Sequence, residues 1–256
     1  TPDYANFLLS CWKDWVAEDK PGEAIPAVWP GRGMRERVPK DIDGRLGYYS
    51  FAAETSLTEG TWDAACASAN VALTAQALVA NGEPAAFALC RPPGHHAHAD
   101  LLGGYCFFNN AAISAQAFRD QGAKRVAILD VDFHHGNGTQ GIFYDRADIL
   151  FCSLHGDPSV FYPYYAGYAD ERGAGKGVGY NLNIPLAPKT GDDAYMLALG
   201  NALNAIKEFA PEYLLISLGL DTQENDPLGI LSITTDGFYR MGRAIGAMVQ
   251  PTLIVQ

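Results

Sequence analysis

The sequence predicts an α/β domain in which a mostly parallel sheet carries helices on both faces. Short segments that are almost wholly apolar alternate with helical segments after about residue 60. Strands buried on both faces are apolar throughout, and strand–helix alternation gives parallel strands joined by right-handed crossovers. The chain has 256 residues, of which 48% are hydrophobic, and this is enough for one large core. We therefore expect residues 1–256 to form a single domain.

The segment before this alternation is expected to contain one helix and a long insertion. Apolar residues repeat at helical spacing over 3–18, and Asp3 is placed to cap that helix. Residues 19–53 are rich in proline and glycine and show no clear period. A loop of this length inside a compact domain is usually functional or an interaction arm, and a disordered linker is the alternative.

The alternating part of the chain follows this insertion. Helices are expected at 61–81, 109–121, 192–209 and 236–248. Strands are expected at 85–90, 125–132, 148–155, 213–220 and 252–256.

The composition argues against several classes of function. The chain has 18 basic and 29 acidic residues and a net charge of −11, which argues against a nucleic-acid-binding protein, because such a protein needs a basic face. This charge is compatible with a cationic substrate. We expect no membrane contact and a cytoplasmic location, because no apolar run approaches about 20 residues and the first residues do not resemble a signal peptide. The five cysteines are scattered without a C-x-x-C pair, which argues against a disulfide scaffold or a thiolate zinc site.

Histidine is distributed unevenly: all six lie between His95 and His155. They and several carboxylates follow the carboxyl ends of four expected strands, in RPPGHHAHAD, DVDFHHGNG, SLH and LGLDTQENDP. Ligands bind beyond these strand ends in an open parallel sheet. The sequence therefore predicts one site that collects imidazoles and carboxylates from four strands.

Asp132, His134 and Asp221 are the candidate metal ligands. Asp132 and His134 are two apart on a segment expected to be extended, so their side chains would leave the same face, and Asp221 follows another strand. Three protein ligands with an open fourth position are typical of a catalytic metal. A buried structural pair is the alternative for an isolated D-x-H, but Asp221 and the other histidines favour the metal.

His95 and His96 are candidates for proton transfer. They follow an R-P-P-G turn that can aim both rings into one cleft, and imidazole is suited to proton transfer near neutral pH. Asp130 could hold one ring and raise its pKa, while the neutral Asn137 could hold the other with a smaller effect. Such a pair would supply an acid and a base of different strength.

The remaining polar and aromatic candidates have weaker support. His98, His135 and His155 are expected to be structural. The aromatic segments at 103–105 and 161–162 are candidate channel walls, with ordinary loop packing as the alternative.

Four ordered motifs resemble the histone deacetylase superfamily, and especially its bacterial acetylpolyamine amidohydrolases: RPPGHHAHADLLGGYCFFNNAA, DVDFHHGNGTQGIFY, SLHGDPSVFYP and LGLDTQENDPLG. The resemblance extends from Thr1 to Gln256. It implies the arginase–deacetylase fold. It also implies a zinc-dependent amidohydrolase that removes acetyl groups from acetylated polyamines or similar amines and releases acetate.

The resemblance also implies roles for particular residues. The three candidate ligands would bind one zinc ion, and His95 and His96 would be the tandem histidines. The difference in charge between Asp130 and Asn137 leads to the hypothesis that His96 is the base and His95 the cationic partner of Asp130. A potassium site is implied near the metal at Asp130 and Ser153. Contacts with the substrate are implied for Tyr105, Tyr162, Gly104, Leu228 and Glu54.

The same resemblance implies a role for the insertion at 19–53. In the bacterial amidohydrolases it forms the dimer interface and narrows the mouth of the active site. The chain is therefore expected to be a homodimer that takes a small cationic acetylated amine, whose distal ammonium would meet Glu54. The sequence ends before the Glu-Gly-Gly-Tyr loop that carries the family's oxyanion-stabilising tyrosine. We expect it to be a fragment without both ends, and losing such a donor costs roughly 100- to 1000-fold in turnover.

Three alternative functions have some support in the sequence or in its fold class. A protein acetyl-lysine deacetylase of the histone type is the main alternative, and a narrowed mouth disfavours it. An arginase-type ureohydrolase would need a second metal-binding carboxylate at position 136, where this chain has Gly136. A non-catalytic module that binds a metal or an acylated amine is supported only by the tyrosine that the sequence does not reach.

Overall fold

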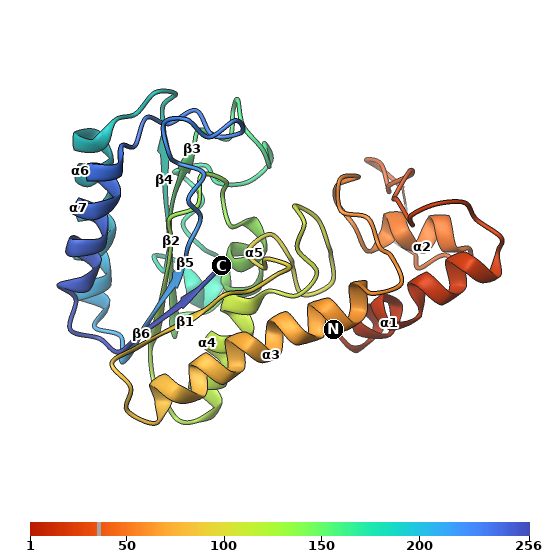
Figure 1. Cartoon of the computed structure of the whole chain (residues 1–256), viewed down its shortest axis with the longest axis horizontal. Helices are drawn as coiled ribbons and strands as arrows, with labels where there is room; N and C mark the ends of the chain where they lie inside the picture. Colours follow the sequence, from red (N-terminus) through yellow and green to blue (C-terminus); the bar gives the residue numbers. More distant parts are fainter. Residues whose placement is uncertain (35–36) are drawn as a thin grey trace.

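A six-stranded parallel sheet forms the centre of the computed structural model, which describes residues 1–34 and 37–256 (Figure 1). The strand order is β1-β6-β5-β2-β3-β4, and every neighbouring pair is parallel. The strands are β1 Ala85–Ala88, β2 Val126–Asp130, β3 Ile149–Gly156, β4 Asn181–Leu186, β5 Tyr213–Ser217 and β6 Thr252–Val255. The predicted α/β class with a parallel sheet is confirmed.

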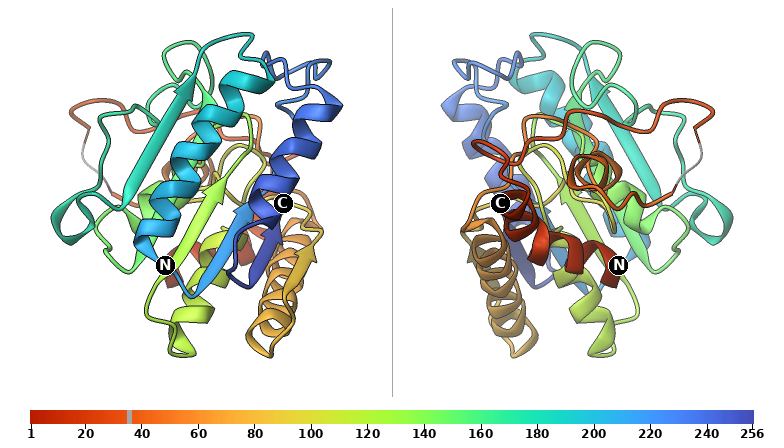
Figure 2. Two further views of the ribbon diagram at one scale, coloured as in Figure 1. Left: turned by 90° about the vertical axis from the view of Figure 1, so that its left-hand side faces the viewer. Right: turned by 90° about the vertical axis from the view of Figure 1, so that its right-hand side faces the viewer.

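Helices cover both faces of this sheet (Figure 2). They are α1 Pro2–Ala17, α2 Ile42–Tyr48, α3 Thr61–Ala80, α4 Asn110–Asp120, α5 Asn137–Phe143, α6 Asp192–Phe209 and α7 Thr235–Gly246, with a 3-10 turn at Gly175–Gly177. Helices α6 and α7 lie on one face, and α3 and α4 pack against the other. No helix within the described ranges has the length and apolar character needed to cross a membrane.

Strand β2 shows how the sequence specifies these two layers. Ala127 and Leu129 pack into the core beneath α6 and α7, whereas Val126 and Ile128 pack into the core beneath α3 and α4. All four are fully buried. Alternate residues of a strand point to opposite faces, so a strand buried on both sides has to be apolar throughout.

A third core joins α1 and α2 to residues that follow them, including Ala65, Leu102 and Phe107, at the end of the molecule away from α6 and α7 (Figure 1). The insertion at 19–53 contains α2, which the sequence analysis did not predict, because seven residues with two glycines give a weak helical signal. Arg45 of α2 donates to Asp14 of α1 at 2.7 Å. Helix α2 of the insertion is therefore packed against α1; positions 35–36 lie outside the described residues.

Strand β4 and helix α5 were also not predicted. Asn181 and Asn183 of β4 are buried polar residues, and both donate to Gln140 Oε1 of α5, at 2.9 and 2.8 Å. Buried amides are tolerated when they are hydrogen-bonded, but a distant partner leaves no local trace in the sequence. A smaller correction concerns α1, where Thr1 accepts from the backbone N–H of Tyr4 and Asp3 lies in the first turn.

Candidate active site and metal centre

A pocket of about 510 Å³ opens where β2 and β5 end. We call its innermost residues the floor: His95, His96, Asp132, His134 and Asp221. Tyr162 and Gly104 form part of its wall, and we call the exposed residues Glu54, Tyr105 and Leu228 the rim. The structure thus brings into one pocket the three candidate metal ligands, the tandem histidines and the five residues expected to contact substrate.

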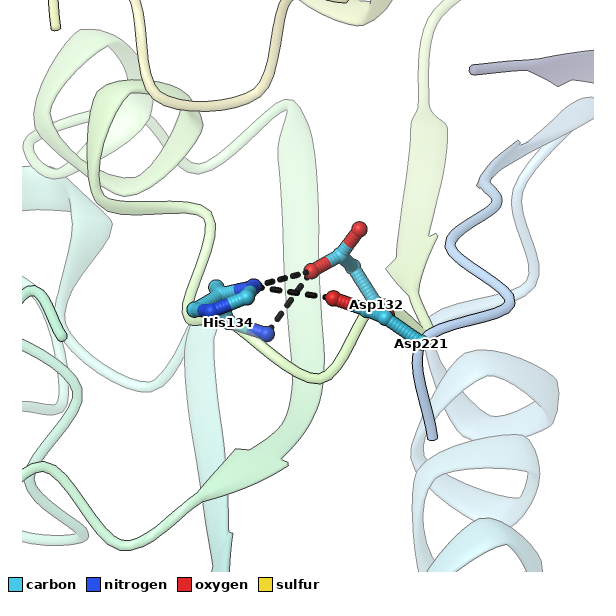
Figure 3. Close-up of side chains that lie close together, drawn as sticks. All are labelled: Asp132, His134 and Asp221. Atoms are coloured by element: carbon cyan, nitrogen blue, oxygen red, sulfur yellow. Dashed lines mark hydrogen bonds and ion pairs between the residues drawn. The ribbon is translucent and has the colours of Figure 1, made fainter. Parts of the chain in front are cut away.

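The three candidate metal ligands converge on one point (Figure 3). His134 Nδ1 lies 2.9 Å from an oxygen of Asp221 and 3.2 Å from an oxygen of Asp132. One ligand atom from each residue can be chosen so that all lie within 4.8 Å of one another. One imidazole and two carboxylates in this arrangement fit a divalent cation such as zinc.

The local backbone at this centre differs from the expected extended segment. Strand β2 ends at Asp130, and Asp132 and His134 lie in the bend that follows. Backbone hydrogen bonds fix the carboxylates: His134 N–H donates to Asp132 at 2.7 Å, and Phe133 N–H donates to Asp221 at 2.9 Å. Two side chains two positions apart therefore converge because of a turn and not because of strand alternation.

The charges at this centre attract a cation. Burial lowers the pKa of His134, but hydrogen bonds and charge from Asp132 and Asp221 raise it to about 10. Gly219 leaves room for the site, since a Cβ at this position would lie 2.0 Å from an oxygen of Asp132. Gly219 was not among the predicted site residues; its position two residues before Asp221 was the available signal.

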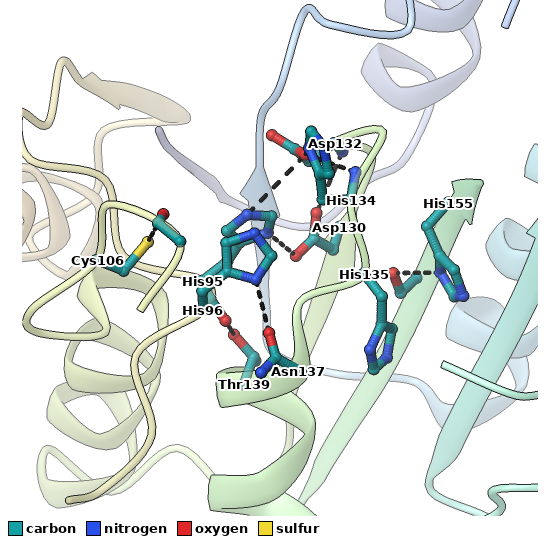
Figure 4. A network of polar contacts seen from close by, with 12 residues as sticks. His95, His96, Cys106, Asp130, Asp132, His134, His135, Asn137, Thr139 and His155 are labelled. Atoms are coloured by element: carbon teal, nitrogen blue, oxygen red, sulfur yellow. Dashed lines mark hydrogen bonds and ion pairs between the residues drawn. The ribbon is translucent and has the colours of Figure 1, made fainter. Parts of the chain in front are cut away.

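The tandem histidines have partners of different charge (Figure 4). His95 Nδ1 lies 3.0 Å from the carboxylate of Asp130, and His96 Nδ1 lies 2.6 Å from Asn137 Oδ1. Burial lowers the pKa of His95, but Asp130 and Asp132 raise it to about 9. Burial and the neighbouring His95 hold the pKa of His96 well below its ordinary value. One ring is therefore disposed to be cationic and the other neutral.

Two glycines, which have no side chain, allow close packing around the loop that carries the tandem histidines. Gly104 has a positive φ of 56°, and a Cβ there would lie 2.2 Å from the ring of His96. A Cβ at Gly138, in the first turn of α5, would lie 2.2 Å from the carbonyl oxygen of Ala97. Any larger residue at these positions would displace the loop that carries the rings.

The wall and rim consist of aromatic and polar loop residues. The ring of Tyr162 meets the ring of His96 edge-on, with centroids 5.1 Å apart. Burial, and then the carboxylate of Glu54, raises the pKa of Tyr162 well above its ordinary range. Glu54 itself accepts a hydrogen bond from the backbone N–H of Gly104 at 3.0 Å. A carboxylate therefore stands at the mouth of the pocket.

The residues expected to hold potassium lie behind the floor. Asp130 and Ser153 are paired in register on β2 and β3, and both are fully buried. The hydroxyl of Ser153 lies 2.9 Å from His155 Nδ1. Ser153 and His155 both lie inside β3, within the expected strand range 148–155, and the strand ends at Gly156.

His135 and His155 form a buried pair beside this region. Their ring centroids are 4.6 Å apart, and neither has any exposed surface. Burial lowers the pKa of both, that of His155 to about 4. His155 Nε2 is held by the carbonyl oxygen of Gly167 at 2.8 Å, and His135 Nε2 lies 3.2 Å from Asn183.

Comparison with known proteins gives the class to which this site belongs. The sequence matches the histone deacetylase domain over residues 1–256, so the chain belongs to the histone deacetylase family. The predicted family and the arginase–deacetylase fold are thereby confirmed. The chain is accordingly an enzyme of the deacetylase and amidohydrolase class.

Its similarity to individual proteins is more specific. Acetylpolyamine amidohydrolase 2 of Pseudomonas aeruginosa is 54% identical over 252 residues, which cover 98% of this chain and 73% of that protein. The acetylpolyamine amidohydrolase of Mycoplana ramosa is 49% identical, with 98% and 74% covered. The crystal structure of acetylpolyamine aminohydrolase from Burkholderia pseudomallei has a TM-score of 0.95 at 45% identity, covering 100% of this chain and 74% of that one.

Proposed function

We propose that this chain hydrolyses acetylated polyamines, or similar acetylated linear amines, to the free amine and acetate. The observation that carries the proposal is the pairing of a His/Asp/Asp donor set with two histidines of unlike environment on one pocket floor. Relatives about half identical to the chain bear the name acetylpolyamine amidohydrolase.

Asp132, His134 and Asp221 would hold one zinc ion at this floor. Zinc, when bound, polarises an acyl carbonyl and lowers the pKa of water from about 15.7 toward neutrality. A two-metal site would need a further carboxylate at position 136, where this chain has Gly136, and a Cβ there would lie 2.3 Å from a carboxylate oxygen of Asp130. This supports the amidohydrolase over the two-metal ureohydrolase.

The two histidines would divide the proton transfers between them. His96 is bonded to Asn137 through Nδ1, so its Nε2 remains available to take a proton from the attacking water. His95, paired with Asp130, would remain cationic and stabilise negative charge that develops on the substrate. A protonated histidine would then donate a proton to the leaving amine.

The wall and rim would select the substrate. An aliphatic chain can lie between Tyr105 and Tyr162, while the carboxylate of Glu54 offers an ion pair to a distal ammonium. The net charge of −11 favours approach of a polycation. A small diamine fits these features better than an acetyl-lysine inside a folded partner does.

The experiment that tests this proposal compares two substrates on the zinc-loaded protein. Acetate release from acetylputrescine is expected to have a higher kcat/KM than release from an acetyl-lysine peptide. A preference for the peptide would favour the histone-type alternative. Metal bound without acetate release from either substrate would favour the non-catalytic module.

Two further features belong to this proposal. Potassium would bind near Asp130 and Ser153, and adding potassium to a potassium-free preparation should then change turnover.

The insertion at 19–53 would form a homodimer interface, because it exposes apolar side chains, including Val28 and Met34 at 66% each. Light scattering on a Val28→Asp variant tests the dimer, which should shift toward monomer.

A further inference from the structure

The side chain of Asn137 connects His96 to a third histidine, which none of the assigned roles includes. Asn137 Oδ1 lies 2.6 Å from His96 Nδ1, and Asn137 Nδ2 lies 3.1 Å from His98 Nε2. Asn137 is the first residue of α5 and is 7% exposed. Within residues 1–34 and 37–256, these two imidazoles are the only hydrogen-bond partners of its amide side chain.

The chemistry of an amide determines the direction of both hydrogen bonds. The Nδ2 group can only donate and Oδ1 can only accept. His98 Nε2 must therefore accept, and its proton is on Nδ1. His96 Nδ1 must donate, so when His96 is neutral its lone pair is on Nε2.

The opposite orientation of the amide would give the opposite result. If Nδ2 faced His96, then His96 Nδ1 would have to accept, and Nε2 would carry the proton. A protonated Nε2 cannot take a proton from water. Whether His96 Nε2 can act as a base therefore depends on the hydrogen-bond acceptor of Asn137 Nδ2, which is His98 Nε2.

The surroundings of His98 favour a neutral ring, which has one nitrogen that can accept. Its ring packs edge-on against Phe51, with centroids 5.8 Å apart. Gly141 of α5 lies beneath it, and a Cβ there would come within 2.6 Å of His98 Nδ1. Burial lowers the pKa of His98, which favours the neutral ring.

We infer that His98 is a positioning residue: by accepting a hydrogen bond from Asn137, it orients the amide so that His96 is protonated on Nδ1 and basic at Nε2. The catalytic consequence of this arrangement rests on the proposed amide hydrolysis. The tautomer of His96 does not depend on the reaction. An amide cannot readily pass a proton along, so His98 acts by orientation and not as a proton relay.

A matched pair of variants tests the inference. His98→Gln keeps an acceptor that can reach Asn137 Nδ2, whereas His98→Leu keeps the approximate size without an acceptor. We expect His98→Leu to lower kcat by roughly 10-fold, with KM changed by less than about twofold, as is typical for loss of a group behind a catalytic residue. His98→Gln should recover most of the loss. Equal losses in both variants would overturn the inference.

A spectroscopic measurement separates this inference from the proposed function. Nitrogen-15 NMR of histidine side chains reports the tautomer of His96 in metal-free protein, where no turnover is needed. The native protein and His98→Gln should have His96 protonated on Nδ1, and His98→Leu should show a mixture. An unchanged tautomer in His98→Leu would refute the inference, whereas the expected tautomers without acetate release would refute only the proposed function.

The variant Asn137→Asp makes the orientation of this side chain irrelevant. In Asn137→Asp, either carboxylate oxygen can accept from His96, so the acceptor on His98 is no longer needed for that purpose. His98→Leu should then cost little in kcat relative to Asn137→Asp alone. A loss of about 10-fold that persists in this background would mean that His98 acts through the general structure of the loop.

Discussion

The floor and the rim of the pocket are built in different ways. On the floor, His95 and His96 are buried and each ring has a partner behind it, at 3.0 and 2.6 Å. On the rim, Tyr105 and Leu228 are 57% and 65% exposed and belong to loops. Buried hydrogen bonds fix the geometry of the two floor rings, whereas the two rim side chains are mostly exposed to solvent.

Because of this difference, the floor should determine the rate of the chemical step and the rim should determine which substrate binds. Changes on the floor should alter the chemical step, because the side chains there cannot adjust without breaking buried hydrogen bonds. Changes on the rim should alter which substrate binds, because exposed side chains contribute small and independent energies.

The largest effect is expected from His96→Ala on the floor. Removing a general base typically lowers turnover by roughly 100- to 10,000-fold. Bound zinc should stay at one ion per chain, since the three ligands are untouched. The measurement is kcat together with metal content. Near-normal turnover with zinc bound would assign the base to another residue.

A backbone position supporting the floor should have the next largest effect. In Gly104→Ala the new Cβ would meet the ring of His96 at 2.2 Å, at a positive φ. A displacement of about 1 Å can cost on the order of 100-fold in turnover. Gly200→Ala is the control, because no atom lies within 4 Å of its Cβ. If both variants retain native kcat, the floor is more adaptable than its packing indicates.

The rim is tested by Glu54→Gln, which keeps the acceptor for the N–H of Gly104 but removes the charge. An exposed ion pair contributes up to about 1 kcal/mol, so KM for acetylputrescine should rise by roughly fivefold with kcat unchanged. The same variant should leave KM for N-butylacetamide, which lacks the ammonium, unaltered. A fall in kcat on both substrates would place Glu54 in the chemistry.

The smallest effect is expected from Asp148. This residue directly precedes β3, so it lies at the amino ends of the strands, whereas the pocket lies at their carboxyl ends. Hydrogen bonds from Arg146, and further ones from Arg119, lower the pKa of Asp148 to about 2, although partial burial opposes them. A depressed pKa stabilises the fold above the unfolded-state value near 3.9, and this contribution is lost as pH falls toward 2.

Asp148→Asn should therefore reduce the free energy of unfolding by about 1 kcal/mol at pH 7, after allowance for solvent screening. The difference from the native protein should disappear near pH 2 to 3, which urea unfolding at several pH values would measure. Turnover per folded molecule should not change. A difference that is independent of pH would mean that the charge of Asp148 is not the cause.

The sequence predicted the parts of this molecule that depend on local pattern. Ala127, Leu129 and their neighbours specify a doubly buried strand by being apolar, and the polar motifs fall at or just beyond the carboxyl ends of such strands. Strand β4 was missed because Asn181 and Asn183 interrupt the apolar pattern, and only Gln140 on another element accounts for their burial.

The same distinction applies to the site. That Asp132, His134 and Asp221 meet could be inferred from strand ends, but the bend after Asp130 that brings them together could not. The role inferred for His98 had no sequence signal, since it depends on which way one amide faces. Contacts between side chains of different elements are the information that periodicity does not carry.

The glycine at position 136 has a consequence for how such sites can evolve. A carboxylate there would be needed to bridge a second metal ion, yet even a single methyl group at this position would lie 2.3 Å from Asp130. A one-residue substitution would therefore damage the charge partner of His95 before it created a new ligand. Passage between the one-metal and two-metal chemistries would require Asp130 to move first, so no single mutational step connects them.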